Sequence, residues 1–493
     1  MNEDLARRSI DSVKWNFISN ILYNAVYLAQ TIILARLLPV EAFGIYAGAG
    51  AIVVMANGFS TFGIASAFIH RCKETEDIEQ AAAVHFTLQT ILSAVWIILI
   101  LLIGFLFLDR SEPGLFTAFS VLAVTTVVKN FASTPRLILN RQIRFQRYSV
   151  ISVIDAVITF ISAVLLAVLK QPIWALLATN ISNAILQIVL LFFWRPVWKP
   201  RFLWKTDVVK YFLSFGSKHL AGGLLLDVLD RGDDYWTKNY LGVDPLGYYS
   251  RAYALAKVPA NIISTPIFSV AMSTYAELKE DRKGLSQAFF ETNALLIRMG
   301  FLFVGILALI APEFIRILLG EKWMPMVFTF QLMLPFTMFD PLKQLMASVF
   351  IAVGKPGTTV QIRTIQVFVL IGFLFLLGPT FGIEGVAVAV DVMMVVGIIL
   401  ILFWARKYVD LYLGPMFLAP GIALFAGLAA GYVVDHFFFM NMNAWVLMIG
   451  KSFIIGCVYC LTLWLFERER IFYMVKLLKK YIFKKGNPKT ISA

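Results

Sequence analysis

The sequence contains little charge for its length. Lys, Arg, Asp and Glu together make up 15% of the 493 residues, whereas hydrophobic residues make up 59%. A water-soluble domain of this size would have too few polar side chains to cover its surface. The hydrophobic residues come in blocks of roughly twenty or more, the length of a helix that crosses a hydrocarbon core about 30 Å thick. The composition therefore predicts an all-α integral membrane protein.

Cysteine is also scarce. The three cysteines are Cys72, Cys457 and Cys460, and the last two form a C-x-x-C motif inside a hydrophobic segment. No histidine or second C-x-x-C motif lies near them to complete a zinc site. We therefore expect small side chains packed in a membrane helix, with no metal site and no disulfide framework.

Several enzyme signatures are missing. There is no G-x-x-x-x-G-K-[ST] motif, and the segment Gly354–Thr358 lacks the spacing that cradles phosphate. H-E-x-x-H and G-x-S-x-G are absent as well. We expect no enzyme activity, no cofactor and no direct use of ATP, so that energy comes from an ion gradient or from the later fate of the product. Residues 1–14 lack the apolar stretch of a cleavable signal peptide, so we expect the first transmembrane helix to direct insertion.

Hydrophobic blocks bounded by charges and turn residues predict about fourteen transmembrane helices joined by short loops. Their expected ranges are 15–36, 44–68, 82–108, 115–135, 149–169, 173–194, 209–240, 248–275, 287–319, 325–353, 359–379, 382–405, 415–437 and 444–466.

Lys and Arg cluster in alternate loops, for example between Arg136 and Arg147, whereas the other loops carry scattered charges such as Arg110 and Lys170. Basic loops resist translocation, so both chain ends are expected in the cytoplasm. This asymmetry accounts for the net charge of +13 without a nucleic-acid partner. The tail Glu467–Lys485 interleaves aromatic residues with lysines. It is typical of an amphipathic helix on an anionic membrane surface, and the alternative is a docking site for a cytoplasmic enzyme.

One loop occurs twice. Leu37-Leu38-Pro39-Val40-Glu41-Ala42-Phe43-Gly44-Ile45-Tyr46 returns about two hundred residues later as Tyr240-Leu241-Gly242-Val243-Asp244-Pro245-Leu246-Gly247-Tyr248-Tyr249. Each unit holds six predicted helices, an even number, so the two copies are expected to be parallel repeats. We predict an N-terminal six-helix lobe (1–200), a C-terminal six-helix lobe (201–408), two extra helices (409–466) and a basic cytoplasmic tail (467–493).

Six short segments resemble the signatures of one known family, in the same order along the chain. They are Ile33–Pro39 with Phe43-Gly44, Phe62–Arg71, Leu139–Phe145, Leu246–Tyr253, Gly320–Trp323 and Phe381–Ala387. The chain resembles the polysaccharide transporter family, the Wzx-like flippases of the multidrug/oligosaccharidyl-lipid/polysaccharide superfamily, from about Asp11 to about Arg406.

The resemblance implies a MATE-like pair of lobes in the bacterial inner membrane. It further implies a flippase that carries oligosaccharides on undecaprenyl pyrophosphate from the inner to the outer leaflet, for O-antigen, capsule or exopolysaccharide synthesis. A proton or sodium counter-ion and a polymerase or export machinery are the expected partners. The alternatives are a multidrug/cation antiporter of the same superfamily and a membrane polymerase or ligase.

Acidic side chains inside the predicted spans are candidates for ion coupling, because an ionisable group in a span usually faces a cavity or a partner. Asp227, Arg231 and Asp234 share one face of the segment 209–240, which also carries Asp233. A proton or cation site, an internal salt bridge and a transferase-type metal motif are all compatible with this cluster. The full set of candidates is Asp227, Asp230, Asp234, Asp340 and Asp391.

Basic side chains in the spans are candidates for binding the pyrophosphate of the implied cargo, since Arg offers bidentate contacts and Lys a point charge. Lys257 is expected deep in its helix, whereas Arg298 and Arg363 could instead snorkel to the cytoplasmic surface. Asp340 and Lys343 could simply pair with each other. The full set of candidates is Lys257, Arg298, Arg231, Arg251 and Arg363.

Overall fold

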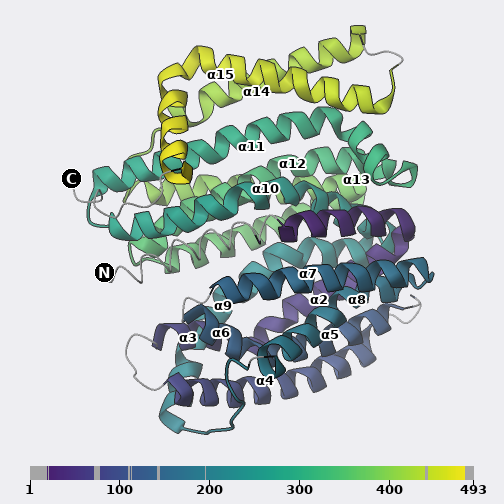
Figure 1. The fold of residues 1–493 in the computed structure, drawn as a ribbon, viewed down its shortest axis with the longest axis vertical. Helices are drawn as coiled ribbons and strands as arrows, with labels where there is room; N and C mark the ends of the chain where they lie inside the picture. Colours follow the sequence, from purple (N-terminus) through teal and green to yellow (C-terminus); the bar gives the residue numbers. More distant parts are fainter. Residues whose placement is uncertain are drawn as a thin grey trace.

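The computed structural model describes residues 19, 22–71, 78–108, 112, 114–141, 145–194, 196–438 and 442–483. Within these residues the protein consists of helices and contains no β-strand. Most helices run side by side in Figure 1. The start of the predicted first helix, the signature residues 142–144, Cys72 and the end of the tail lie outside the described residues.

The first half contains a helix over residues 22–37, followed by helices of between 5 and 30 residues. They are α2 (Val40–Thr61), α3 (Ile64–Arg71), α4 (Ile78–Phe107), α5 (Leu115–Phe131), α6 (Ser133–Arg141), α7 (Phe145–Val168), α8 (Pro172–Ile188) and η1 (Val189–Phe193).

The second half contains longer helices. They are α9 (Thr206–Tyr240), α10 (Val243–Glu277), α11 (Arg282–Leu318), η2 (Glu321–Met326), α12 (Val327–Ala352), α13 (Gly357–Ala405), α14 (Leu413–Phe438) and α15 (Ala444–Phe483). Each of the fourteen predicted ranges overlaps a helix of the structure.

Eight of the described helices are long and apolar enough to cross a membrane, or nine if the bent pair α5 and α6 counts as one span. A multi-pass membrane protein is thereby confirmed, and the number fourteen stays a prediction. The helices α9, α10 and α12 are not among the eight. These are the helices that carry the charged candidates Asp230, Lys257 and Asp340, and charged side chains lower the mean hydropathy of a segment.

The long helix α13 is two helices joined end to end. It contains 49 residues, which would measure about 74 Å if straight, more than twice the thickness of a hydrocarbon core. The chain leaves helical geometry at Gly382, where φ is 59° and ψ is −139°. A glycine adopts this positive φ without steric cost. The sequence boundary predicted between 379 and 382 coincides with this break.

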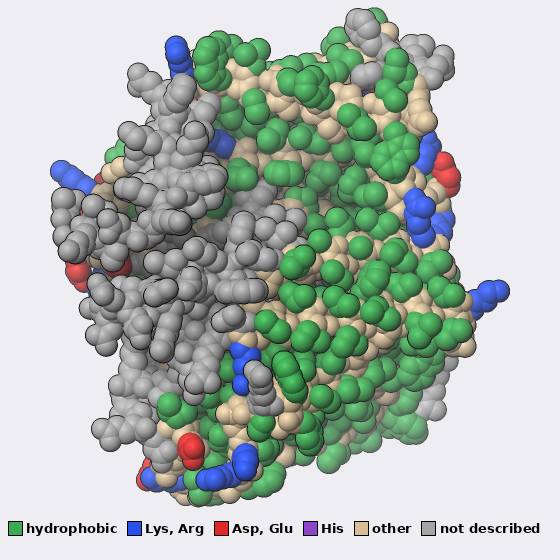
Figure 2. Space-filling view, in the orientation of Figure 1, with side chains coloured by type: hydrophobic (Ala, Val, Ile, Leu, Met, Phe, Trp, Pro, Cys, Tyr) green, Lys and Arg blue, Asp and Glu red, His purple; other side chains and the backbone are tan. Residues whose placement is uncertain are grey.

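The surface matches a membrane environment. In Figure 2 hydrophobic side chains cover most of the centre right of the visible face, and many of the coloured Lys and Arg lie toward its right and left margins. The helices run across the view in the same orientation, so the charges lie near helix ends. Aromatic and aliphatic side chains such as Phe107, Phe368 and Phe425 are exposed on these helices, as expected for contact with lipid.

The two copies of the duplicated loop contact each other, and the contact is reciprocal. A Cβ atom on Gly44 would lie 1.8 Å from the carbonyl oxygen of Val243, and one on Gly247 would lie 2.5 Å from the carbonyl oxygen of Val40. In the alignment of the two copies, Gly44 corresponds to Gly247 and Val40 to Val243. Equivalent residues therefore exchange equivalent contacts. We call this contact the glycine clasp.

Side chains from η2 reinforce the glycine clasp. The indole nitrogen of Trp323 donates a hydrogen bond to the carbonyl oxygen of Ala35 at 2.9 Å, and Lys322 donates to the carbonyl oxygen of Leu38 at 2.7 Å. The ring of Phe43 packs edge-on against Trp323, with centroids 5.4 Å apart. The largest hydrophobic core runs from these residues into the second half.

The helix α9 belongs to both halves of the molecule. Its first turns supply Val208, Val209 and Phe212 to a core formed with α3, α4 and α6. A Cβ atom on Gly216 would lie 2.3 Å from the carbonyl oxygen of Phe62, so the backbones of α9 and of the turn after α2 touch. Farther along, α9 supplies Leu229 and Trp236 to the largest core. The boundary predicted at residue 201 therefore precedes a segment that packs with the first half.

Two buried ion pairs hold α15 against α11, one toward each end of this helix pair. Arg298 and Glu467 form a bidentate pair with N–O distances of 2.6 to 2.9 Å, and both side chains are under 10% exposed. At the other end Lys451 lies 2.8 Å from both Glu313 and Asp435. Buried charges tolerate only paired arrangements, so the two pairs fix the register of α15 on α11. Beyond Glu467 the α15 backbone turns away from the span (Figure 1).

Candidate substrate cavity and charge cluster

Two of the acidic residues of α9 are paired with partners from α9 and α10. Arg231 and Asp234, one helical turn apart, form a salt bridge of 3.0 Å. Asp233 accepts a hydrogen bond of 2.5 Å from the hydroxyl of Tyr249, which is fully buried. Part of the α9 group is thus an internal salt bridge, as one of the sequence interpretations expected. The inter-helix partner Tyr249 was not predicted.

Asp230 lies among charges from three helices. Its electrostatic partners include Lys257 of α10 and both Asp340 and Lys343 of α12. Asp340 and Lys343 lie 3.3 Å apart, as expected from their spacing, and Gln344 donates a hydrogen bond of 2.8 Å to Asp340. The packing of α9, α10 and α12 therefore brings together charges that are far apart in the sequence.

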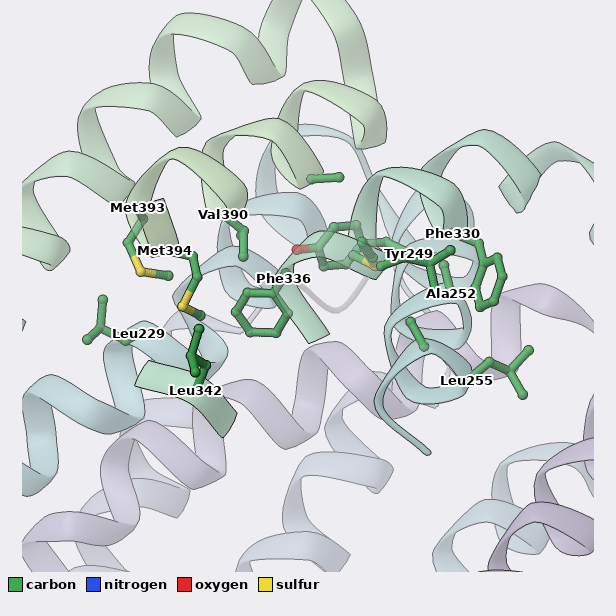
Figure 3. Packing of buried hydrophobic residues seen from close by; sticks show 14 of the residues in the cluster. Leu229, Tyr249, Ala252, Leu255, Phe330, Phe336, Leu342, Val390, Met393 and Met394 are labelled. Carbon is green, nitrogen blue, oxygen red and sulfur yellow. The ribbon is translucent and has the colours of Figure 1, made fainter. Parts of the chain in front are cut away.

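A cavity of about 360 Å³ opens beside Lys257 and Asp340. The ammonium of Lys257 donates a hydrogen bond of 2.8 Å to the hydroxyl of Tyr253 and lies 5.0 Å from the centre of the same ring. Phe336 also lines the cavity and packs against Tyr253. Figure 3 shows Phe336 beside Met394 and Leu342. The cavity is thus lined by both apolar and charged side chains, as small-ligand sites commonly are.

Two more predicted cations lie near this group. The guanidinium of Arg251 sits 4.5 Å from the ring centre of Phe43 in the glycine clasp and interacts with Asp234. Its Nε atom is buried and has no hydrogen-bond partner among the described residues. Arg363 donates a hydrogen bond of 3.0 Å to the carbonyl oxygen of Gly222 and interacts with Asp230.

Together these residues form one charge cluster with equal numbers of acids and cations. The cations are Arg231, Arg251, Lys257, Lys343 and Arg363, and the acids are Asp227, Asp230, Asp233, Asp234 and Asp340. The cluster therefore combines cations that were candidates for phosphate binding with acids that were candidates for ion coupling.

Two predicted site residues lie apart from the charge cluster. Arg298 is held by Glu467 and by the carbonyl oxygens of Ala294 and Pro415, so it neither lines the cavity nor reaches the surface. Asp391 on α13 bonds to the backbone of Phe336, directly after Pro335. One of its carboxylate oxygens is buried without a partner among the described residues.

A second polar group lies in the first half, and the sequence analysis did not predict that its members come together. Asn183 donates to Asp155, Gln187 donates to Asn183 at 3.1 Å, and Arg136 donates to Gln187. One turn away, Lys129 donates to Asn180 at 2.8 Å. This group borders a cavity of about 310 Å³, which we call the N-half cavity.

A signal for the N-half cavity was present in the sequence. Asn180, Asn183 and Gln187 are spaced three and four residues apart in one predicted span, so they share a helix face. Such amides are less conspicuous than charges because helix–helix hydrogen bonding also explains them. No cluster of three or more His, Cys, Asp or Glu residues that could hold a metal ion occurs in the part of the chain that the structure describes.

Solved transporter structures share this fold. The lipid II flippase MurJ in an inward closed conformation matches with a TM-score of 0.78 at 14% identity, over 94% of this chain and all of that one. An inward-facing multidrug resistance MATE transporter matches with a TM-score of 0.60 at 18% identity, over 79% of this chain and 94% of that one. At these identities the likeness concerns the fold alone.

Similar sequences have names that refer to polysaccharides. The lipopolysaccharide biosynthesis protein WzxC of Escherichia coli (strain K12) is 22% identical over 402 residues, 81% of each chain. The teichuronic acid biosynthesis protein TuaB of Bacillus subtilis (strain 168) is 24% identical over 332 residues, covering 66% of this chain and 67% of TuaB. The succinoglycan biosynthesis transport protein ExoT of Rhizobium meliloti (strain 1021) is 24% identical, covering 63% of each chain.

The family comparison spans both copies of the duplicated loop. Residues 33–328 match the model of a family described as polysaccharide biosynthesis protein. This match includes the glycine clasp, the acidic face of α9 and Lys257. Since it covers more than half of the chain, the protein belongs to the polysaccharide biosynthesis protein family.

Proposed function

We propose that this protein is a flippase of the bacterial inner membrane that moves oligosaccharides linked to undecaprenyl pyrophosphate from the inner to the outer leaflet. The product would feed the synthesis of an O-antigen, capsule or exopolysaccharide. In this proposal the chain crosses the membrane fourteen times with both ends in the cytoplasm, and its two six-helix lobes alternate access to the substrate. Family membership and the names of its relatives support this proposal.

The observation that carries the proposal is Lys257 beside the cavity of the second half. It is a cation that lines the same cavity as the apolar Phe336, which suits a cargo with a diphosphate and a lipid. An ammonium in a poorly hydrated site binds phosphate oxygens strongly. Because Asp230 and Asp340 already compensate nearby cations, a pyrophosphate must compete with these carboxylates.

The competition offers a route to ion coupling. A proton or sodium ion that neutralises Asp230 or Asp340 would free Lys257 for the phosphate, and departure of the ion would help release it. Neutral Asp230→Asn should therefore hold the lipid more tightly and transport it more slowly. Both effects follow from the same lost negative charge.

The proposal is tested with purified protein in liposomes that contain a fluorescent undecaprenyl-pyrophosphate oligosaccharide. Label in the outer leaflet is quenched with and without an imposed proton or sodium gradient. Protein-dependent movement of label supports the flippase. If several glycans fail to move under every gradient while a cationic dye is exported, the protein is a cation antiporter instead.

Replacing Lys257 by alanine should reduce the initial rate of lipid movement by about tenfold or more, because a charge-assisted hydrogen bond contributes roughly 1.5–3 kcal/mol. Lys257→Arg should retain most of the rate, since the positive charge remains. Lys283→Met, which removes an exposed lysine at the start of α11, is the matched control. Equal rates for Lys257→Ala and the control would remove Lys257 from the substrate site.

A further inference from the structure

The N-half cavity lies apart from the charge cluster and has a different chemistry. Its polar lining comes from the first helix, α6, α7 and α8. These lining residues are Ser19, Tyr23, Arg136, Ser152, Asp155, Asn183 and Gln187. The set combines one carboxylate, one guanidinium, two carboxamides, two serine hydroxyls and one tyrosine phenol. A hydroxyl-rich ring can satisfy all of them, because each sugar hydroxyl donates one hydrogen bond and accepts others.

The planar groups in this cavity are already oriented by one another. Arg136, Gln187, Asn183 and Asp155 form a continuous chain of hydrogen bonds. The chain uses one oxygen of Asp155, and the other oxygen is buried without a partner among the described residues. That oxygen has almost no accessible surface, so a ligand in the cavity does not reach it in this conformation. Fixed polar groups that offer both donors and acceptors are what a polyhydroxylated ligand requires.

The local charge argues against a metal or sodium ion in this position. Asp155 interacts electrostatically with both Lys129 and Arg136, so one acid faces two cations. A third cation would be repelled by the two already present. An anion would meet Asp155 but also the two cations, so the local charge does not exclude it. The mixture of donors and acceptors in the lining favours a ligand that carries both.

The size and position of the N-half cavity also fit part of a larger cargo. A volume of about 310 Å³ is at the lower end of the range for small-molecule sites, roughly 300–1,000 Å³, so it suits a sugar ring better than a lipid. The helix 22–37, drawn in purple between the two halves in Figure 1, carries Tyr23 at this cavity. At its other end Ala35 bonds to Trp323 of the second half.

We propose that the N-half cavity is a sugar subsite, which binds one ring of the oligosaccharide while the cavity at Lys257 binds the pyrophosphate. This inference rests on the proposed function and adds to it a division of the cargo between the two halves. Asp155 and Gln187 would accept and donate hydrogen bonds to ring hydroxyls, and Tyr23 would offer an aromatic face.

The test compares two lipids bound to purified protein in nanodiscs. One is undecaprenyl pyrophosphate, and the other is the lipid-linked repeat unit extracted from cells of the native host. We expect wild-type protein to bind the second lipid roughly tenfold more tightly than the first. Gln187→Ala and Asp155→Asn should abolish this difference and leave the affinity for undecaprenyl pyrophosphate unchanged. Asn180→Ala, on the same helix but outside the cavity lining, should keep the difference.

Each other outcome contradicts a specific statement. If wild-type protein binds both lipids equally, the sugar subsite is wrong and the flippase proposal stands. If it binds neither lipid, the proposed function fails and the subsite with it. Loss of affinity for both lipids in Gln187→Ala would assign that residue a structural role. If the lipid affinity of wild-type protein differs between sodium and potassium, and this difference is lost in Asp155→Asn while the sugar has no effect, the cavity is an ion site.

A second measurement does not depend on whether these variants fold. Ser152, which also lines the N-half cavity, is replaced by cysteine in a protein whose three natural cysteines are serines. The rate of maleimide labelling at position 152 should fall severalfold with the lipid-linked repeat unit and not with undecaprenyl pyrophosphate. Equal protection by both lipids would overturn the sugar subsite.

Discussion

A single methyl group at position 44 is expected to prevent the two halves of the protein from closing on each other. In Gly44→Ala the new Cβ atom would lie 1.8 Å from the carbonyl oxygen of Val243, which belongs to the backbone and cannot rotate away. Overpacking of side chains typically lowers stability by about 1–3 kcal/mol, and a clash with backbone atoms relaxes less easily than a clash with a side chain. We expect a loss of at least about 3 kcal/mol, with most of the protein failing to fold at 37 °C.

The measurement is thermal unfolding in detergent, together with the yield of monodisperse protein. Gly247→Ala should behave in the same way, since its Cβ atom would lie 2.5 Å from the carbonyl oxygen of Val40. Gly223→Ala in α9 is the matched control, because no atom lies within 4 Å of its new Cβ. Alanine there should stabilise the helix by up to about 1 kcal/mol. Indistinguishable melting temperatures for the variants at 44 and 223 would disprove the glycine clasp.

Breaking the pair between Arg298 and Glu467 should destabilise the protein by about 3–5 kcal/mol, because one charge would remain buried without compensation. Arg298→Ala and Glu467→Ala are both expected to show this loss. The double variant Arg298→Ala with Glu467→Ala should lose less than the sum of the two. The swap Arg298→Glu with Glu467→Arg should recover only part of it, because Arg298 also bonds the carbonyl oxygens of Ala294 and Pro415.

Melting temperatures give the stability, and limited proteolysis reports release of the tail after Glu467. The control is Arg282→Ala, which breaks the 2.9 Å pair with Asp410. Both members of that pair are about half exposed, so its loss should change stability by less than about 1 kcal/mol. If Arg298→Ala were no worse than Arg282→Ala, the pair with Glu467 would not anchor α15.

The helices of this fold could be predicted because membrane spans leave a strong signal. Long apolar blocks exist only where a helix satisfies its own backbone in lipid, and even the break near Gly382 was visible as a boundary. The short helices α3 and α6 were joined to their neighbours in the prediction, because a bend within a span does not change its hydropathy. The contact between the duplicated loops required the structure, since sequence similarity does not indicate that the two copies touch.

The charged residues of the site could be predicted from the sequence because charges are rare in membrane spans. A charge in a span is expensive, so Asp230, Lys257 and Asp340 were conspicuous. Their partners were harder to find, because Tyr249, Tyr253 and Gln344 are ordinary residues in a membrane helix. Arg298 was a candidate because it is a cation in a span, and its partner Glu467 lies at the start of the segment interpreted as the cytoplasmic tail. Pairing depends on which helices pack together, and a single sequence carries little of that information.

The double membership of α9 constrains any motion between the halves. Its first turns are held by Phe212 and Gly216 in the core of the first half, and its last turns are held by Trp236 in the core of the second. One continuous helix thus connects the first half to the second half. Because α2 also packs beside α9 as far as Lys238, rotation of one half against the other must bend α9 or separate it from part of one half. Gly222 and Gly223 lie in α9 between Gly216 and Leu229. Because glycine has no side chain, the helix is easiest to bend at this pair.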